Sequence, residues 1–117
     1  MSRLQNRGAG APGADVLRGE LWWAEIPEVG EHPVVLVSRD ASYDRRRRAT
    51  VALVTSTIRG IPVEVPVGTA NGLVHESVIN TDELQTIRIT WLVERIGDLS
   101  PEQRARLDAA LRFALGL

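Results

Sequence analysis

The stretch Glu31-His32-Pro33-Val34-Val35-Leu36-Val37-Ser38-Arg39-Asp40 decides the fold that we predict for this chain. Pro33 has no backbone N–H, so it suits the first residue of a strand better than its middle. The run from Val34 to Val37 is β-branched and aliphatic without a break, which is typical of a strand covered on both faces. His32 precedes this strand, where a loop delivers a polar side chain onto a rigid scaffold. The stretch therefore predicts the central strand of a small barrel or sandwich.

Length and composition limit the chain to one domain. Its 117 residues, 44% of them hydrophobic, suffice for one core but not for two. The net charge of −1 argues against a general polyanion binder, so any contact with nucleic acid must come from local patches. The chain has no Cys, which excludes disulfides and thiolate metal sites. No apolar run approaches the roughly 18 residues that a membrane helix needs, and no secretory signal is visible. We expect a cytoplasmic protein without membrane contact.

The order of polar and apolar segments predicts a flexible tail followed by a β-rich domain. Residues 1–15 carry little bulky apolar surface and are expected to form the tail, whereas 16–117 form the domain. The alternation of side chains at Trp22 and Trp23 sends the two rings to opposite faces of the first strand. Strands are expected at Val16–Ile26, Pro33–Val37, Ala49–Thr57, Ile61–Pro66 (at a sheet edge, because of its two prolines), Ser77–Leu84 and Ile89–Ile96.

The last element is predicted to be an amphipathic helix. Ser100 is suited to the N-cap, Pro101 to the first helical position, and Gln103 completes a capping box. Apolar residues then recur on one helical face, at Leu107, Ala110, Leu111, Ala114 and Leu115. Short strands followed by one such helix indicate a mainly β domain, a small and strongly bent barrel with the helix packed on it.

Few residues of this chain are suited to catalysis or to binding a metal or cofactor. The two histidines, His32 and His75, are too few for a metal site, and no phosphate-binding glycine loop supports a nucleotide cofactor. We therefore expect no metal or cofactor. His32 is suited to acid–base chemistry near neutral pH, or else it only caps a strand. Thr55 is suited to donate a hydrogen bond to an oxyanion, or else it is an ordinary strand residue. The remaining polar groups at strand ends are Ser56, Thr57, Glu83 and Gln85.

Four consecutive arginines, Arg45, Arg46, Arg47 and Arg48, form the most charged segment. They fit a phosphate-binding patch, and they fit equally well a solvated loop. The residues alone leave this choice open.

Several segments, in order, resemble the MazF/PemK family of toxin–antitoxin ribonucleases. Arg18-Gly19-Glu20-Leu21-Trp22 resembles the family's opening strand, Pro33-Val34-Val35-Leu36-Val37-Ser38 its PVLVVS, and Ile61-Pro62-Val63-Glu64-Val65 its LPTHVEL. The strongest segment, Leu92-Val93-Glu94-Arg95-Ile96-Gly97-Asp98-Leu99-Ser100-Pro101-Glu102, resembles the ending RLVKRIGRLSPE. The resemblance runs from about Val16 to Leu117. It implies a CcdB/PemK-like toxin fold, an SH3-like barrel of five to seven strands with a C-terminal helix.

The same resemblance implies a sequence-specific, metal-independent endoribonuclease. In this family the ribose 2′-OH of single-stranded RNA attacks the adjacent phosphate and leaves a 2′,3′-cyclic phosphate. A homodimer with an RNA-binding groove and a small MazE-like antitoxin as inhibitor are implied as partners. Family catalysis uses an Arg before the Pro of PVLVVS, which is His32 here, and a Thr that Thr55 matches. The candidate RNA-binding residues are Glu31, Ser56, Thr57, Arg59, Glu83, Gln85 and Arg45 to Arg48.

The segment Asp82-Glu83-Leu84-Gln85-Thr86 departs from the family's DQIRT, with Glu83 in place of Gln and Gln85 in place of Arg. The alternatives are a non-catalytic toxin of the same fold that binds DNA gyrase, and a catalytically silent member that only binds its antitoxin. Trp91 and one ring of the Trp22–Trp23 pair exceed what so small a barrel can bury, which favours a homodimer.

Overall fold

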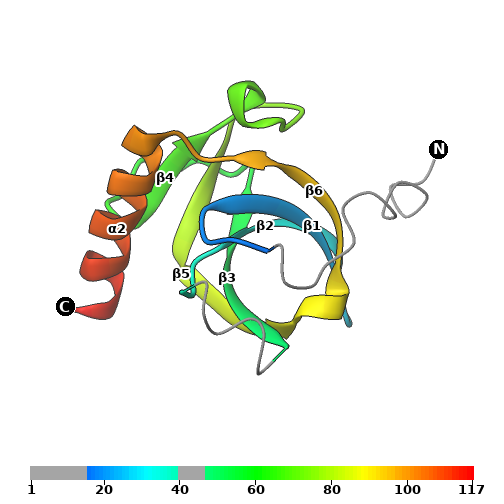
Figure 1. Cartoon of the computed structure of the whole chain (residues 1–117). Coiled ribbons are helices and arrows are strands. Elements are labelled where there is room, and N and C mark those ends of the chain that lie inside the picture. Colours follow the sequence, from blue (N-terminus) through cyan, green and yellow to red (C-terminus); the bar gives the residue numbers. More distant parts are fainter. Residues whose placement is uncertain (1–15, 40–46) are drawn as a thin grey trace.

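The computed structural model describes residues 16–39 and 47–117, and it shows a curled antiparallel sheet followed by a C-terminal helix (Figure 1). Six strands form the sheet in the order β4-β5-β3-β2-β1-β6. The expected barrel with a C-terminal helix is confirmed. The elements are β1 (Glu20–Ile26), β2 (Gly30–Leu36), β3 (Arg48–Thr55), β4 (Glu64–Val67), the 3-10 turn η3 (Thr69–Asn71), β5 (Ser77–Arg88), the 3-10 turn η4 (Ile89–Trp91), β6 (Leu92–Asp98) and α2 (Pro101–Leu115).

Strand β2 is buried on both faces, as its apolar run predicts. Val34 and Leu36 belong to one apolar cluster and Val35 to the other, and all three are fully buried. The expectation that Pro33 begins the strand is wrong, because β2 starts at Gly30 and Pro33 pairs with Trp23 of β1. Pairing with β3 begins only at Val34. Pro33 therefore lies where β2 is an edge on its β3 side, and an edge position tolerates a missing N–H.

Other strand limits also differ from the expected ones. The first strand begins at Glu20 instead of Val16, because Arg18 and Gly19 form a turn that the Glu20 carboxylate closes by accepting the Leu17 N–H (3.0 Å). Strand β4 keeps its predicted edge position but covers only Glu64–Val67. Strand β5 continues to Arg88, and the last strand begins after η4.

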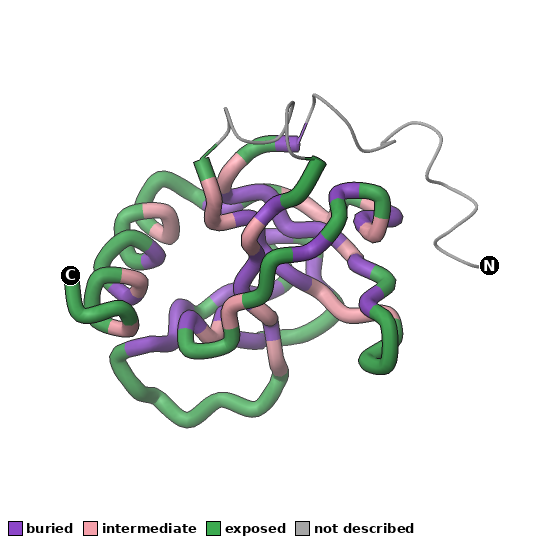
Figure 2. The backbone as a smooth tube through the Cα atoms, turned by 90° about the horizontal axis from the view of Figure 1, so that it is seen from below, coloured by how far each residue is buried: buried purple, intermediate pink, exposed green. Residues whose placement is uncertain are grey.

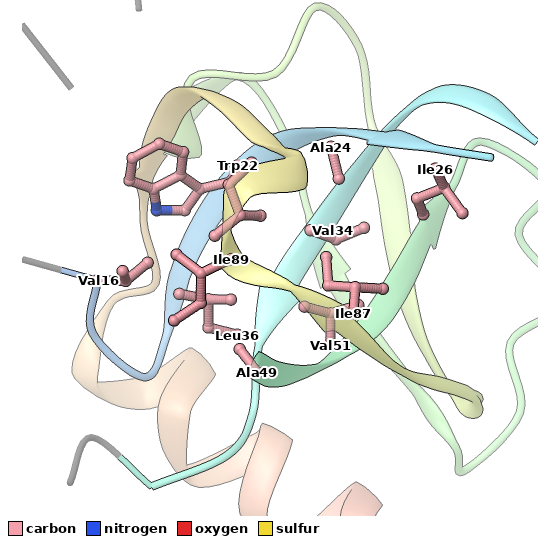
Figure 3. Close-up of a cluster of buried hydrophobic side chains, with 11 residues drawn as sticks. Val16, Trp22, Ala24, Ile26, Val34, Leu36, Ala49, Val51, Ile87 and Ile89 are labelled. Atoms are coloured by element: carbon pink, nitrogen blue, oxygen red, sulfur yellow. The ribbon is translucent and has the colours of Figure 1, made fainter. Parts of the chain in front are cut away.

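The neighbouring tryptophans point to opposite faces of β1, as predicted. Trp22 is buried in the barrel interior beside Val16, Leu36 and Ile89 (Figure 3). Its indole N–H donates to Glu20 Oε1 (3.1 Å), and Arg95 donates to Glu20 Oε2 (3.2 Å), so this buried carboxylate has partners on both oxygens. A hydrogen bond to Asp98 raises the pKa of Arg95, and the Arg95 charge persists at every working pH.

Helix α2 begins as the sequence predicts. Ser100 Oγ accepts the Gln103 N–H (3.1 Å), and Gln103 Oε1 accepts the Ser100 N–H (2.9 Å). Leu107 and Ala110 are buried in the second apolar cluster, where the helix packs on β4 and β5. The outer side of α2 faces solvent (Figure 2), and Leu115, expected on the buried face, is 55% exposed because it lies in the helix's last turn.

A buried amide ties the helix to the sheet. Asn71 Nδ2 donates to the Asp98 carbonyl (2.9 Å) and to Gln103 Oε1 (2.7 Å), while its Oδ1 accepts the Gly68 N–H (3.0 Å). Buried polar groups with all partners present favour one packing arrangement over others. This network fixes the start of α2 against η3 and the end of β6.

Candidate active site

The antiparallel register brings His32 and Thr55 together at one end of the barrel. Val34 pairs with Leu53 and Val35 with Ala52, so continuing this register places His32 opposite Thr55. Both side chains line a pocket of about 260 Å³. The other residues that line it are Leu53, Thr57, Arg59, Asn80 and Glu83. Three strands, β2, β3 and β5, and the loop between β3 and β4 therefore contribute polar groups to one small cavity.

An irregularity in β5 delivers two of these groups. Ala52 pairs with Leu84, but the next residue, Leu53, pairs with Asn80, so residues 81–83 have no partner on β3. Thr81 anchors the bulge by donating from Oγ1 to the Val63 carbonyl (2.7 Å). Bulges change the direction of side chains beside functional sites, and this one brings Glu83 into the same pocket as Asn80.

A buried carboxylate holds the loop that carries Arg59. Glu64 is only 7% exposed, and its Oε1 accepts the backbone N–H groups of Arg59 (3.0 Å) and Gly60 (2.8 Å). Charge-assisted bonds of this kind are stronger than neutral ones. Glu64 itself is absent from the pocket lining and acts through the position of Arg59.

The hydroxyl of Thr55 is oriented by its own turn. Thr55 Oγ1 accepts the Thr57 N–H (3.1 Å). A hydroxyl has one proton to donate and two lone pairs. With one lone pair engaged by the backbone, its proton is available to a phosphoryl oxygen in the pocket.

One ring nitrogen of His32, Nε2, is buried and has no hydrogen-bond partner. Such an atom in a native structure calls for an explanation, and a catalytic role is one of the recognised ones. An imidazole with an open nitrogen beside a threonine hydroxyl can exchange a proton with a substrate near neutral pH.

A second pocket of about 240 Å³ adjoins the first, and His32 and Thr55 line both. Its other polar lining comes from Ser56, His75, Ser77 and the indole of Trp23. The His32–Thr55 pair is thus the boundary between two small cavities. An extended polymer lying across this boundary can place one unit on each side.

The sequence-based candidates divide into two sets. The two pockets are lined by the candidates His32, Thr55, Ser56, Thr57, Arg59 and Glu83. Neither pocket is lined by Glu31, Gln85, Arg47 or Arg48. Gln85 pairs with Val51, and Arg48 pairs with Arg88 at the far end of β3. Arg45 and Arg46 lie outside the described residues.

Four polar lining residues were missed as site candidates: Asn80, Trp23, His75 and Ser77. The position of Asn80 depends on the β5 bulge, which has no clear sequence signal. The signal for His75 was its rarity, because the chain has only two histidines. Across residues 16–39 and 47–117, no cluster of three or more His, Cys, Asp or Glu suited to a metal is present. In the same residues, no helix is long and apolar enough to cross a membrane.

The fold and the site define a small barrel toxin of the CcdB/PemK-like fold, with a pocket lined by His32 and Thr55 at one end of its sheet. Residues 17–115 match the sequence model of the PemK-like, MazF-like toxins of type II toxin–antitoxin systems. The chain belongs to this family.

Individual relatives agree with this assignment. The chain is 39% identical over 99 residues to the probable endoribonuclease MazF5 of Mycobacterium tuberculosis (strain H37Rv), a match that covers 84% of this chain and 91% of the relative. The solved structure of the M. tuberculosis toxin MazF-mt6 aligns with a TM-score of 0.78 at 34% identity, covering 84% of this chain and 97% of that one. A mycobacterial endoribonuclease in complex with its cognate antitoxin aligns with a TM-score of 0.78 at 27% identity, covering 87% and 96%.

Proposed function

We propose that this chain is the endoribonuclease toxin of a type II toxin–antitoxin system and that it cleaves single-stranded RNA. The observation that carries the proposal is the His32–Thr55 pair between two polar pockets, in a chain related to proteins named endoribonucleases. In the proposed reaction the 2′-oxygen forms a bond to phosphorus while the bond to the 5′-oxygen breaks. The products are a 2′,3′-cyclic phosphate and a 5′-hydroxyl.

The pocket offers a group for each requirement of that reaction. His32 serves as the acid–base group through its unpartnered Nε2. Thr55 donates its hydroxyl proton to the phosphoryl oxygen as charge builds there. Arg59 supplies positive charge near the phosphate, and Ser56, Thr57, Glu83 and Asn80 contact neighbouring atoms of the RNA.

The run of four arginines, Arg45 to Arg48, is proposed as a secondary RNA contact. Arg47 and Arg48 are exposed. They stand apart from the pockets, so their contribution is long-range attraction of the phosphate backbone. Replacing Arg45 to Arg48 with Gln flattens the salt dependence of RNA binding by up to about 0.7 per lost contact.

The proposed partners are a second copy of the chain and a small MazE-like antitoxin. Trp23 and Trp91 are only partly buried. Ile58 and Phe113 are 55% and 64% exposed and line a groove between the β3–β4 loop and α2. Exposed apolar surface of this kind favours protein contacts, and a related structure contains a cognate antitoxin. Such a toxin acts in the cytoplasm, where its RNA substrate and its antitoxin are made.

Incubation of the purified protein with a mixed RNA pool in EDTA tests the proposal. We expect cleavage with 2′,3′-cyclic phosphate ends, and we expect His32→Ala to slow it by about 10²–10⁴-fold, the scale of one acid–base group. Glu25→Gln, an exposed site on β1, serves as a control. Intact RNA after prolonged incubation, together with inhibition of gyrase, would instead support the non-catalytic alternative.

A further inference from the structure

The two histidines of this chain face one cavity although they come from distant segments. His32 lies on β2 and His75 on the loop between η3 and β5. Both line the pocket of about 240 Å³, together with Thr55. The chain holds no other histidine, so every imidazole available to it is present at this one place.

The size of the cavity limits how far apart the rings of His32 and His75 can lie. A sphere of 240 Å³ is about 8 Å across. Proton transfer to or from a substrate oxygen needs a heavy-atom distance of about 2.6–3.2 Å. A space of this size can admit one phosphodiester group within about 3 Å of the imidazoles that line it.

The structure around His75 leaves its ring free to act. The loop conformation is fixed through the backbone, because Ser77 Oγ donates to the His75 carbonyl oxygen (3.1 Å). His75 is exposed and can exchange protons with water, whereas the Nε2 of His32 is buried without a partner. One imidazole in the cavity is therefore open to solvent and the other is shielded.

We propose that His75 is a second catalytic residue and that it works with His32 as a general acid–base couple. This inference rests on the endoribonuclease function proposed above. His32 Nε2 accepts the proton of the 2′-OH as the 2′-oxygen bonds to phosphorus. His75 donates a proton to the 5′-oxygen as the P–O5′ bond breaks. One proton is taken up and one is given, and solvent exchange restores both rings.

The assignment of roles follows from solvent access. The exposed His75 exchanges protons with water and can regain the proton that an acid gives away, so it is suited to be the acid. The shielded His32 is then left as the base. The charged side chains that line the adjoining pocket are Arg59 and Glu83, and Glu31 and Glu76 are next to the histidines in the chain.

The test uses a leaving group that needs no acid. The cleavage point is first mapped on mixed RNA, and a synthetic oligoribonucleotide spanning it is prepared with either oxygen or sulfur at the bridging 5′ position. A thiolate leaves without protonation. We expect His75→Gln to cleave the oxygen substrate about 10²–10⁴-fold more slowly and the sulfur substrate at nearly the parental rate. We expect His32→Ala to be slow on both.

The pH profile gives a second readout. The parent protein should show a bell-shaped profile, and His75→Gln should lose the fall in rate at high pH, because a missing acid can no longer be deprotonated. Thr69→Ala, at an exposed position of η3 that lines neither pocket, controls for disturbance of this segment and should match the parent.

The outcomes separate the two proposals. A parent protein that cleaves no RNA refutes the proposed function itself. A parent that cleaves, with His75→Gln matching it on the oxygen substrate or equally slow on both substrates, refutes only the role of His75. Added imidazole that raises the rate of His75→Ala but leaves the rates of the parent and of Thr69→Ala unchanged would support that role further.

Discussion

Glu64→Gln should weaken RNA cleavage although Glu64 lines neither pocket formed by His32 and Thr55. Its carboxylate accepts the N–H groups of Arg59 (3.0 and 3.3 Å) and Gly60 (2.8 Å). Hydrogen bonds to a charged group contribute about 1.5–3 kcal/mol each, and neutral ones about 1 kcal/mol. The glutamine keeps one acceptor oxygen but loses the charge. With two donors affected, we expect the free energy of unfolding to fall by about 1–4 kcal/mol.

Glu64→Gln should affect RNA cleavage because it changes the position of Arg59. Arg59→Gln removes a charge-assisted contact to phosphate, and with about 1.4 kcal/mol per factor of ten, a loss of about 1.5–3 kcal/mol raises KM by about 10–100-fold. Glu64→Gln releases the same loop without removing the guanidinium, so its KM should rise by a smaller factor, about 3–10-fold. In the double variant, the Glu64 substitution should add less than about twofold, because the residue that it positions is already gone.

The assay combines urea unfolding with initial cleavage rates, measured at a temperature where every variant is folded. Glu25→Gln is the matched control, since it removes the same charge at an exposed position of β1. If the KM effects of Glu64→Gln and Arg59→Gln simply multiply, Glu64 acts independently of Arg59 and the positioning role is refuted.

Three further substitutions test the site and the fold. Thr55→Val keeps the shape but removes the donor, and should slow cleavage about 10²-fold with little change in unfolding; an unchanged rate would refute the oxyanion role. Leu107→Ala empties a fully buried position between α2 and the sheet and should cost about 2–5 kcal/mol in urea unfolding. A decrease in the free energy of unfolding below about 1 kcal/mol would show that the side chains between α2 and the sheet repack around the shortened residue. Gly97→Ala should lower the thermal midpoint, because its Cβ would collide with the Asn71 carbonyl oxygen; an unchanged midpoint would mean that η3 moves aside easily.

Elements with strong local signals were predictable. The capping box at Ser100 and Gln103 forms because both partners are within one helical turn. The apolar run Val34–Leu36 becomes a strand covered on both faces, and the alternation at Trp22 and Trp23 separates the two rings, as strand geometry requires. The barrel and its C-terminal helix follow from these local preferences and their order.

Strand limits that depend on pairing were less predictable. Pro33 looked like a strand start, yet it lies within β2, because a strand can be paired on one side and open on the other. Leu115 fits the apolar period of α2, yet the sheet does not reach far enough to cover it. In both cases a neighbouring element, and not the local sequence, decides the outcome.

The amino-acid sequence by itself determined the barrel, the capped helix and the end of β3 that carries Thr55, whereas His32, expected in the loop before its strand, lies within β2. Only the tertiary structure decided which other groups join them. Glu83 and Asn80 enter the first pocket through the bulge in β5, and His75 enters the second from a loop far along the chain. Local propensity acts over a few residues, whereas these side chains meet through sheet register and loop packing. Those contacts exist only once the whole barrel has closed.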